Sequence, residues 1–169
     1  LLLWLMIIAL HLVFPLLVYR NYPKNIYLSG VDGGLLVLHA ILLYVYANSL
    51  IERDKKHKSS IKLHLTAFII SNLAVIPYII LDNEIKIAFY ETNAELPAIV
   101  WISSGLINLI FLSYILSTIM LIIKHKKSLQ YEFSQLKNLE LNWLQYLSIG
   151  LLVIYIFITI IGSVLYTEN

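Results

Sequence analysis

Five long stretches of the chain contain no Asp, Glu, Lys or Arg, and this distribution of charge restricts the possible folds more than any other feature. As α-helices, at about 1.5 Å per residue, such stretches are roughly 27 to 39 Å long, against a bilayer core of about 30 Å. The hydrophobic fraction of 60% also exceeds that of ordinary soluble domains. The sequence therefore predicts an all-α, polytopic membrane helix bundle with five transmembrane helices, at about 1–19, 33–50, 63–81, 98–123 and 141–166.

Transmembrane β-strands explain these stretches less well than helices do. Barrel strands are about ten residues long and alternate apolar with polar side chains, whereas these stretches are apolar on every face. A helix also satisfies each backbone N–H and C=O within one segment, which the bilayer core requires.

The basic residues indicate how such a bundle is oriented. Nine of the twelve Lys and Arg residues lie in the loops 51–62 and 124–140, and three lie in the loops 20–32 and 82–97. Basic residues accumulate on the cytoplasmic side of inner membranes. We therefore expect a multi-pass protein of the plasma membrane, with loops 51–62 and 124–140 cytoplasmic and loops 20–32 and 82–97 extracytoplasmic.

Two of these loops have a pattern of their own. In segment 128–136 the apolar residues Leu129, Phe133 and Leu136 recur at helical spacing, which predicts a short amphipathic helix at the inner surface. In loop 82–97, Ile85, Ile87 and Phe89 alternate with other residues, which fits either a strand or an interfacial helix.

The beginning of the chain suggests a fragment. Residue 1 is Leu1 and already lies inside an apolar stretch with no charged region before it, unlike a natural start or a signal peptide. We expect the 169 residues to be one transmembrane sensor bundle, 1–169, cut from a longer protein.

Polar side chains within the expected spans are candidate functional groups, because they are costly in lipid. Ser104 and Asn108 share a helix face, and Gly105 beside them allows a neighbouring helix to approach closely. His39 and His64 can form hydrogen bonds between helices or bind a metal. We interpret all four polar residues as internal polar contacts, in preference to a ligand or metal site.

Catalytic groups are not evident from the sequence. No expected span contains an acidic residue, and neither a nucleophile with a base nor a metal-binding spacing is found. There are no cysteines, so thiol chemistry within the chain is excluded. We predict no enzyme activity, no metal and no cofactor.

Two segments resemble a known family. Segment 38–50, LHAILLYVYANSL, is followed by a basic stretch and by Leu63-His64-Leu65, and segment 134–147 reads SQLKNLELNWLQYL. Both resemble the sensor half of bacterial membrane-bound AraC-type transcriptional regulators. This resemblance implies a seven-helix N-terminal sensor followed by a cytoplasmic helix-turn-helix DNA-binding domain. The five helices here would be its second to sixth, and the DNA-binding domain would lie outside the chain.

The function we expect is therefore signal relay to such an output domain. The junction at Asn142, Trp143 and Tyr146, which follows the amphipathic segment, is the expected coupling point. The expected partners are the lipid bilayer, an unknown signal ligand, DNA through the absent domain only, and a second copy in a homodimer. The alternatives are the sensor region of a histidine kinase, a small-solute transporter or membrane enzyme, and a structural membrane subunit.

Overall fold

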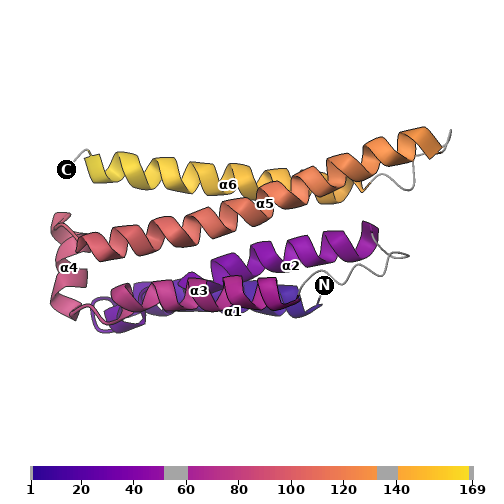
Figure 1. The fold of residues 1–169 in the computed structure, drawn as a ribbon. Coiled ribbons are helices and arrows are strands. Elements are labelled where there is room, and N and C mark those ends of the chain that lie inside the picture. The colour runs from indigo at the N-terminus through magenta and orange to yellow at the C-terminus, as the bar shows by residue number, and fades with distance from the viewer. Residues whose placement is uncertain (1, 52–60, 133–140, 168–169) are drawn as a thin grey trace. The chain divides into compact units, whose positions relative to one another are not determined.

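The computed structural model describes residues 2–51, 61–132 and 141–167, and every regular element in these ranges is a helix. In chain order the elements are α1 (Leu2–Arg20), the 3₁₀ helix η1 (Ile26–Leu28), α2 (Gly33–Ile51), α3 (Ile61–Ile79), α4 (Asn83–Thr92), α5 (Ala98–Glu132) and α6 (Asn142–Thr167), as Figure 1 shows.

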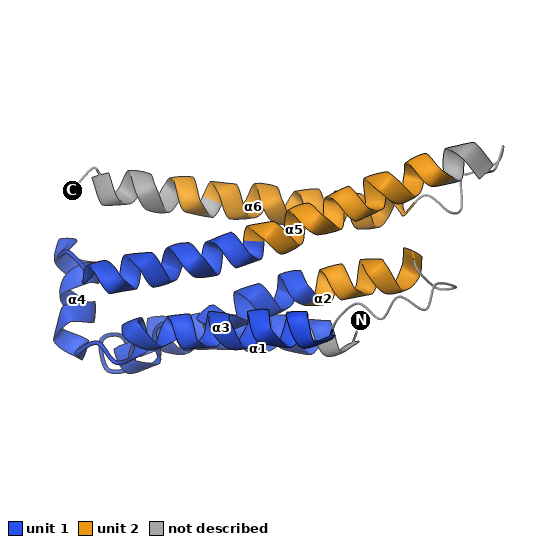
Figure 2. Cartoon of the chain, viewed as in Figure 1, with its two compact units in different colours: residues 1–41, 61–111 blue, residues 42–60, 112–169 orange. Residues whose placement is uncertain are grey.

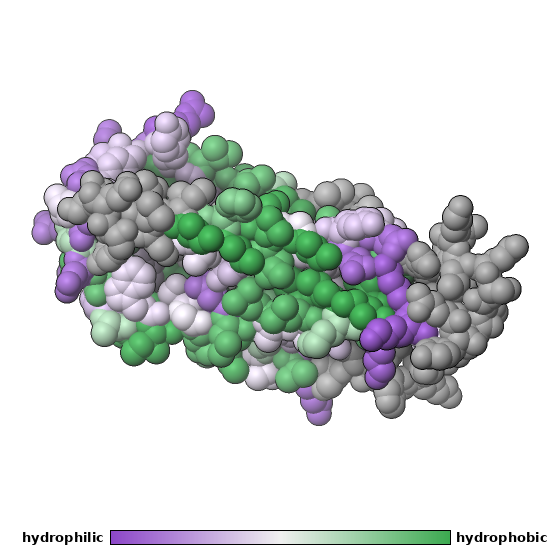
Figure 3. All heavy atoms as spheres, turned by 90° about the horizontal axis from the view of Figure 1, so that it is seen from above, coloured by the Kyte–Doolittle hydropathy of each residue, from purple (hydrophilic) through white to green (hydrophobic). Residues whose placement is uncertain are grey.

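Three helical segments are long and apolar enough to cross a membrane: Ile26–Ile51, Ile61–Ile79 and Ala98–Ser128. Two more apolar helices, Met6–Arg20 and Asn142–Phe157, are shorter over the residues described. The all-helical class is thus confirmed for the described residues, and three of the expected spans coincide with candidate membrane-spanning helices, while five spans stay a prediction. On the face drawn in Figure 3, apolar side chains gather in the middle and hydrophilic ones toward the ends, as is typical of helices whose middles face lipid.

The chain divides into two compact units, coloured separately in Figure 2. Unit 1 contains residues 1–41 and 61–111, and unit 2 contains residues 42–60 and 112–169. Because the divisions fall within α2 and α5, these two helices each belong to both units.

In unit 1 close contacts join α2 to α3 through small residues at the start of α2. A Cβ atom at Gly33 would lie 3.0 Å from Val75 Cγ2, and one at Gly34 would overlap the side chain of Asn72. Gly30, in the turn before α2, has φ of +84°. These glycines allow the backbone of α2 and its preceding turn to approach α3. The unit's buried apolar side chains are Ile26, Val37, Ala40, Ile41, Val75, Leu96, Val100 and Phe111.

Helix α4 lies crosswise to α3 and to the first part of α5 in Figure 1. It ends at Thr92, and the capping residue Asn93 adopts the left-handed conformation with φ of 51° and donates its backbone N–H to the carbonyl of Ala88. Lys86, on this helix, is fully buried, and its Nζ donates to the carbonyl oxygen of Ile79 at 2.9 Å. A cation thus binds a carbonyl at the C-terminus of α3, where the helix dipole is negative.

Unit 2 packs the second half of α2, the second half of α5 and α6. Its buried apolar side chains are Leu43, Ala47, Ile115, Ile122 and Leu144. The buried hydroxyls of Thr118 and Ser148 donate to carbonyls one turn earlier in their own helices, at 2.8 Å in each case. These hydroxyls therefore need no partner from another helix.

Two expectations for the loops are refined by the structure. Segment 82–97 contains the helix α4, so a helix forms there and not a strand, while its position at a membrane interface stays a prediction. Helix α5 continues through Glu132 without the break expected after residue 123, because charge ends a membrane span but does not end a helix. Residues 128–132 therefore continue α5 and do not begin a separate amphipathic helix. Residues 133–136 of the expected amphipathic segment, and the basic stretch 52–60, lie outside the described residues.

Candidate functional site

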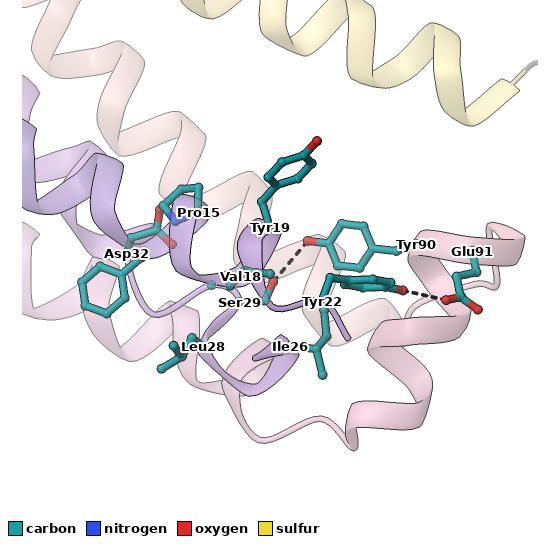
Figure 4. A pocket seen from close by; sticks show the side chains of 12 residues that line it. Pro15, Val18, Tyr19, Tyr22, Ile26, Leu28, Ser29, Asp32, Tyr90 and Glu91 are labelled. Carbon is teal, nitrogen blue, oxygen red and sulfur yellow. Dashed lines mark hydrogen bonds between the residues drawn. The ribbon is translucent and has the colours of Figure 1, made fainter. Parts of the chain in front are cut away.

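Unit 1 contains a cavity of about 560 Å³ between the C-terminal part of α1, the segment around η1, and α4. Figure 4 shows its lining, which is largely apolar and aromatic with a few polar groups. Small-molecule sites commonly have this volume and this mixture of side chains. The lining residues are Phe14, Pro15, Val18, Tyr19, Tyr22, Ile26, Leu28, Ser29, Gly30, Asp32, Tyr90 and Glu91.

Two residues 69 positions apart in the sequence meet at one wall of the cavity. The hydroxyl of Tyr22 donates to Oε1 of Glu91 on α4 at 3.0 Å, as the dashed line in Figure 4 marks. Partial desolvation, the hydrogen bond to Glu91 and the negative charge of Glu91 raise the pKa of Tyr22, which stays partly exposed. Tyr22 therefore stays neutral and a donor at physiological pH, so it holds the loop before η1 against α4.

Three hydroxyl groups meet beside this wall. Ser29 Oγ lies 2.9 Å from the hydroxyl of Tyr78 on α3 and 3.1 Å from that of Tyr90 on α4. The two tyrosine hydroxyls lie 3.4 Å apart. Ser29 is buried, with 7% of its surface exposed, so this cluster links the turn before α2 to both α3 and α4.

A chain of polar contacts leads from the cavity to α2. Asp32 Oδ2, in the lining, lies 3.4 Å from Nε2 of His11 on α1. Nδ1 of His11 lies 2.9 Å from Nε2 of His39 on α2, and the two rings are stacked with centroids 5.1 Å apart. Asp32 and His39 contact opposite nitrogens of His11, so the three residues form a relay and not a metal-binding cluster. Among the described residues, no group of three or more potential metal ligands is found.

The relay has an unpaired end. Nδ1 of His39 is buried and has no hydrogen-bond partner in the structure. A buried nitrogen without a partner is energetically unfavourable. His39, singled out by the sequence, thus makes an interhelical contact with His11.

Ser104 and Asn108 line a second cavity of about 300 Å³ in unit 1. Asn108 Nδ2 lies 3.5 Å from Ser104 Oγ, one turn away on α5, so the contact is within a helix. The close approach of another helix expected at Gly105 is not found among the described residues, since a Cβ there would meet nothing within 4 Å. His64 is buried near the start of α3, with 8% of its surface exposed.

The predicted coupling junction lies in unit 2. Asn142 begins α6, and its Oδ1 accepts a hydrogen bond from Nζ of Lys126 on α5, as does Oε1 of Gln145. The ring of Trp143 packs edge-to-face on Tyr46 of α2, with centroids 6.1 Å apart. Tyr146 is 72% exposed. Two of the three predicted residues thus join α6 to other helices of this unit.

Sequence reasoning missed the residues that line the larger cavity and the partner of His39. The cavity depends on contacts between segments far apart in the sequence, such as Tyr22 with Glu91, and no local pattern encodes them. The contact between His11 and His39 could have been predicted from their positions in the sequence. His11 is nine residues before the end of α1 and His39 is six residues after the start of α2, so a helical hairpin brings them to similar depths.

Family models, curated proteins and solved structures were each compared with the chain, and none of them matches it. The resemblance to membrane-bound AraC-type regulators therefore rests on the sequence motifs at 38–50, 63–65 and 134–147 alone.

Proposed function

We propose that the chain is the membrane-embedded sensor region of a signalling protein, and that the signal ligand binds the cavity between α1, η1 and α4. The observation that carries this proposal is the contact series from that cavity through Asp32 and His11 to His39 on α2. A ligand that contacts Asp32 competes with His11 for the same carboxylate. Ligand binding therefore alters a polar contact inside the helix bundle.

The proposed arrangement has five spans in the plasma membrane, with loops 51–62 and 124–140 in the cytoplasm. The distribution of Lys and Arg supports it. The cavity is then open to the extracytoplasmic side, because its lining comes from residues 14–32 and 90–91, at and beside the two poorly basic loops.

Helix α2 is the element proposed to carry the signal. His39, in unit 1, and Tyr46, in unit 2, lie on this one helix, and Tyr46 contacts Trp143 at the start of α6. A shift of α2 on ligand binding changes the packing of Trp143. The mechanism is a population shift between two packings of the helices, each favoured by a different occupancy of the cavity.

The output that the resemblance favours is a cytoplasmic AraC-type DNA-binding domain, outside these 169 residues and acting in a homodimer. A histidine kinase is the alternative output for the same sensor. On the proposed topology α6 runs from the cytoplasmic to the extracytoplasmic side, so either output needs one further membrane crossing to lie in the cytoplasm.

The proposal is tested in cells that carry the full-length protein. RNA sequencing compares the parent strain with a strain in which residues 1–169 are deleted in frame. We expect a set of genes to lose its regulation, because the output is uncoupled from its signal. Unchanged transcripts and unchanged induction after the deletion contradict the proposal.

Point variants then locate the coupling. Trp143→Ala and Tyr146→Ala are expected to alter induction while membrane yield stays the same. Gly150→Ala, on the same helix, is the matched control, because its added Cβ meets nothing within 4 Å. Normal induction in both aromatic variants would remove the junction from the proposal.

A small-solute transporter is the second candidate, favoured by the cavity that Ser104 and Asn108 line. Uptake of solute by liposomes containing the full-length protein would support it. A transporter should keep its solute uptake when the output domain is removed. A sensor should show no solute uptake with or without that domain.

A further inference from the structure

The described residues that line the larger cavity include acidic groups but no basic ones. Its lining contains the carboxylates of Asp32 and Glu91, and no Lys or Arg is among its described lining residues. The side chain of Asp32 is only 16% exposed, and its contact with His11 is an ion pair only when His11 is protonated. A partly buried carboxylate without a permanent cation gains from a cationic ligand.

The walls supply aromatic rings in addition to this charge. Phe14 and Tyr19 come from α1, Tyr22 from the following loop and Tyr90 from α4. Figure 4 shows Tyr19, Tyr22 and Tyr90 grouped around one region, with Glu91 and Asp32 toward opposite sides of it. Aromatic faces attract organic cations, and quaternary ammonium groups are bound in proteins by clusters of such rings.

The tyrosine hydroxyls leave these faces available. The hydroxyl of Tyr22 is engaged by Glu91, and that of Tyr90 by Ser29. These hydrogen bonds fix the positions of the two rings from their polar ends. The rings are therefore preorganised before any ligand arrives, which reduces the entropy lost on binding.

From these observations we propose that the cavity binds an organic cation, an amine or quaternary ammonium with an apolar group, whose charge pairs with Asp32 while its apolar part lies against Phe14 and Tyr90. This names the ligand class of the sensor and rests on that proposed function only for its biological role. The volume of about 560 Å³ accommodates a molecule of ordinary metabolite size.

An ammonium group can come from a free amine or from a lipid headgroup such as phosphatidylethanolamine. Both ligands would be recognised through the ammonium group, but the lipid headgroup also carries a phosphate. No basic residue among the described lining residues meets that phosphate, so a free cation fits better.

The test is binding of benzyltrimethylammonium to the full chain purified in the uncharged detergent dodecyl maltoside. Saturation-transfer NMR and calorimetry measure the affinity, with benzyl alcohol as the neutral comparison and phenylacetate as the anionic one. We expect saturable binding of the cation alone. Equal affinity for the neutral compound, preference for the anion, or no saturable binding of any of the three overturns the inference.

Variants identify the carboxylate. Asp32→Asn is expected to weaken binding at least about tenfold, since it removes the ion pair. Asp32→Glu restores part of that loss, and Phe14→Leu weakens binding about two- to fivefold through the lost aromatic face. Glu84→Gln is the matched control, because Glu84 is an exposed residue of α4 and lies outside the lining. Equal binding by wild type and Asp32→Asn, each verified as folded by circular dichroism, overturns the inference.

A lipid arm distinguishes the source of the ammonium group. Adding phosphatidylethanolamine to the micelles lowers the apparent affinity for the probe if the headgroup is the natural occupant, and leaves it unchanged if a free cation is. Both results are compatible with an ammonium site. If no probe binds, the inference of a cation site is wrong. The transcript experiment then still decides, separately, whether the chain is a sensor.

Discussion

Single residues of unit 1 have environments that few other residue types would tolerate. Gly30 has a positive φ, and a Cβ there would overlap the ring of Tyr78. Lys86 is fully buried, with a backbone carbonyl as its hydrogen-bond partner and its Nζ 5.3 Å from the centroid of the Tyr78 ring. Both residues border Tyr78, which bonds Ser29 in the cavity wall. The geometry of the cavity therefore depends on these two positions.

Gly30→Ala is expected to destabilise the chain. A non-glycine residue in the left-handed region costs roughly 1 to 2 kcal/mol, and the contact with Tyr78 adds to that cost. Thermal unfolding in detergent, followed by circular dichroism, measures the effect. Gly105→Ala is the control and should be neutral or slightly stabilising, because its Cβ meets nothing within 4 Å. A Gly30→Ala variant as stable as the Gly105→Ala control would contradict this account.

Lys86 predicts a pH dependence of stability. Burial lowers the pKa of Lys86 in the folded state, so the unfolded chain binds its proton more tightly. The free energy of unfolding therefore rises with pH between the folded pKa and the unfolded value of about 10.4. As the pH rises toward that unfolded value, the melting temperature of the wild type should increase relative to that of Lys86→Met.

Lys62→Met controls for the loss of a positive charge, because Lys62 is exposed at the start of α3. Its melting temperature should keep a constant difference from that of the wild type over the same pH range. A constant difference for Lys86→Met as well would mean that Lys86 is not buried as a cation.

At the scale of elements, the hairpin of α1 and α2 is held in register by the contact between His11 and His39. We expect this pair to contribute about 0.5 to 1.5 kcal/mol to stability, the usual range for a hydrogen bond between helices in a membrane protein. A double-mutant cycle with His11→Leu and His39→Leu measures it by unfolding in mixed micelles of increasing denaturing detergent. A coupling energy near zero would show that the rings are merely neighbours.

The bounds of several helices followed from the charge-free stretches because lipid excludes charge. The expected span 33–50 corresponds to Gly33–Ile51, and 63–81 is displaced by only two residues from Ile61–Ile79. The end of α5 could not be found in this way, since Lys124 and its basic neighbours are compatible with a helix outside lipid. The cavity escaped prediction for a different reason. Its walls meet through the contacts of Ser29, Asp32 and Glu91, which depend on the tertiary fold.

For the molecule as a whole, the predicted orientation in the membrane can be tested by labelling introduced cysteines. The chain contains no cysteine, so a single introduced cysteine is the only thiol that a membrane-impermeant maleimide can label. We expect Glu95→Cys to be labelled in intact cells and Lys58→Cys only after the membrane is permeabilised. The reverse pattern would invert the topology and place the cavity on the cytoplasmic side.

The central claim is that occupancy of the cavity in unit 1 changes the junction at the start of α6 in unit 2. The chain has three tryptophans, so Trp4→Phe together with Trp101→Phe leaves Trp143 as the only indole. Its fluorescence emission is followed while benzyltrimethylammonium is titrated into the full chain in dodecyl maltoside. The account predicts a saturable change in Trp143 emission at the concentration where the cation binds, and no change in the Asp32→Asn variant. Constant Trp143 emission while calorimetry shows the cation bound would contradict it.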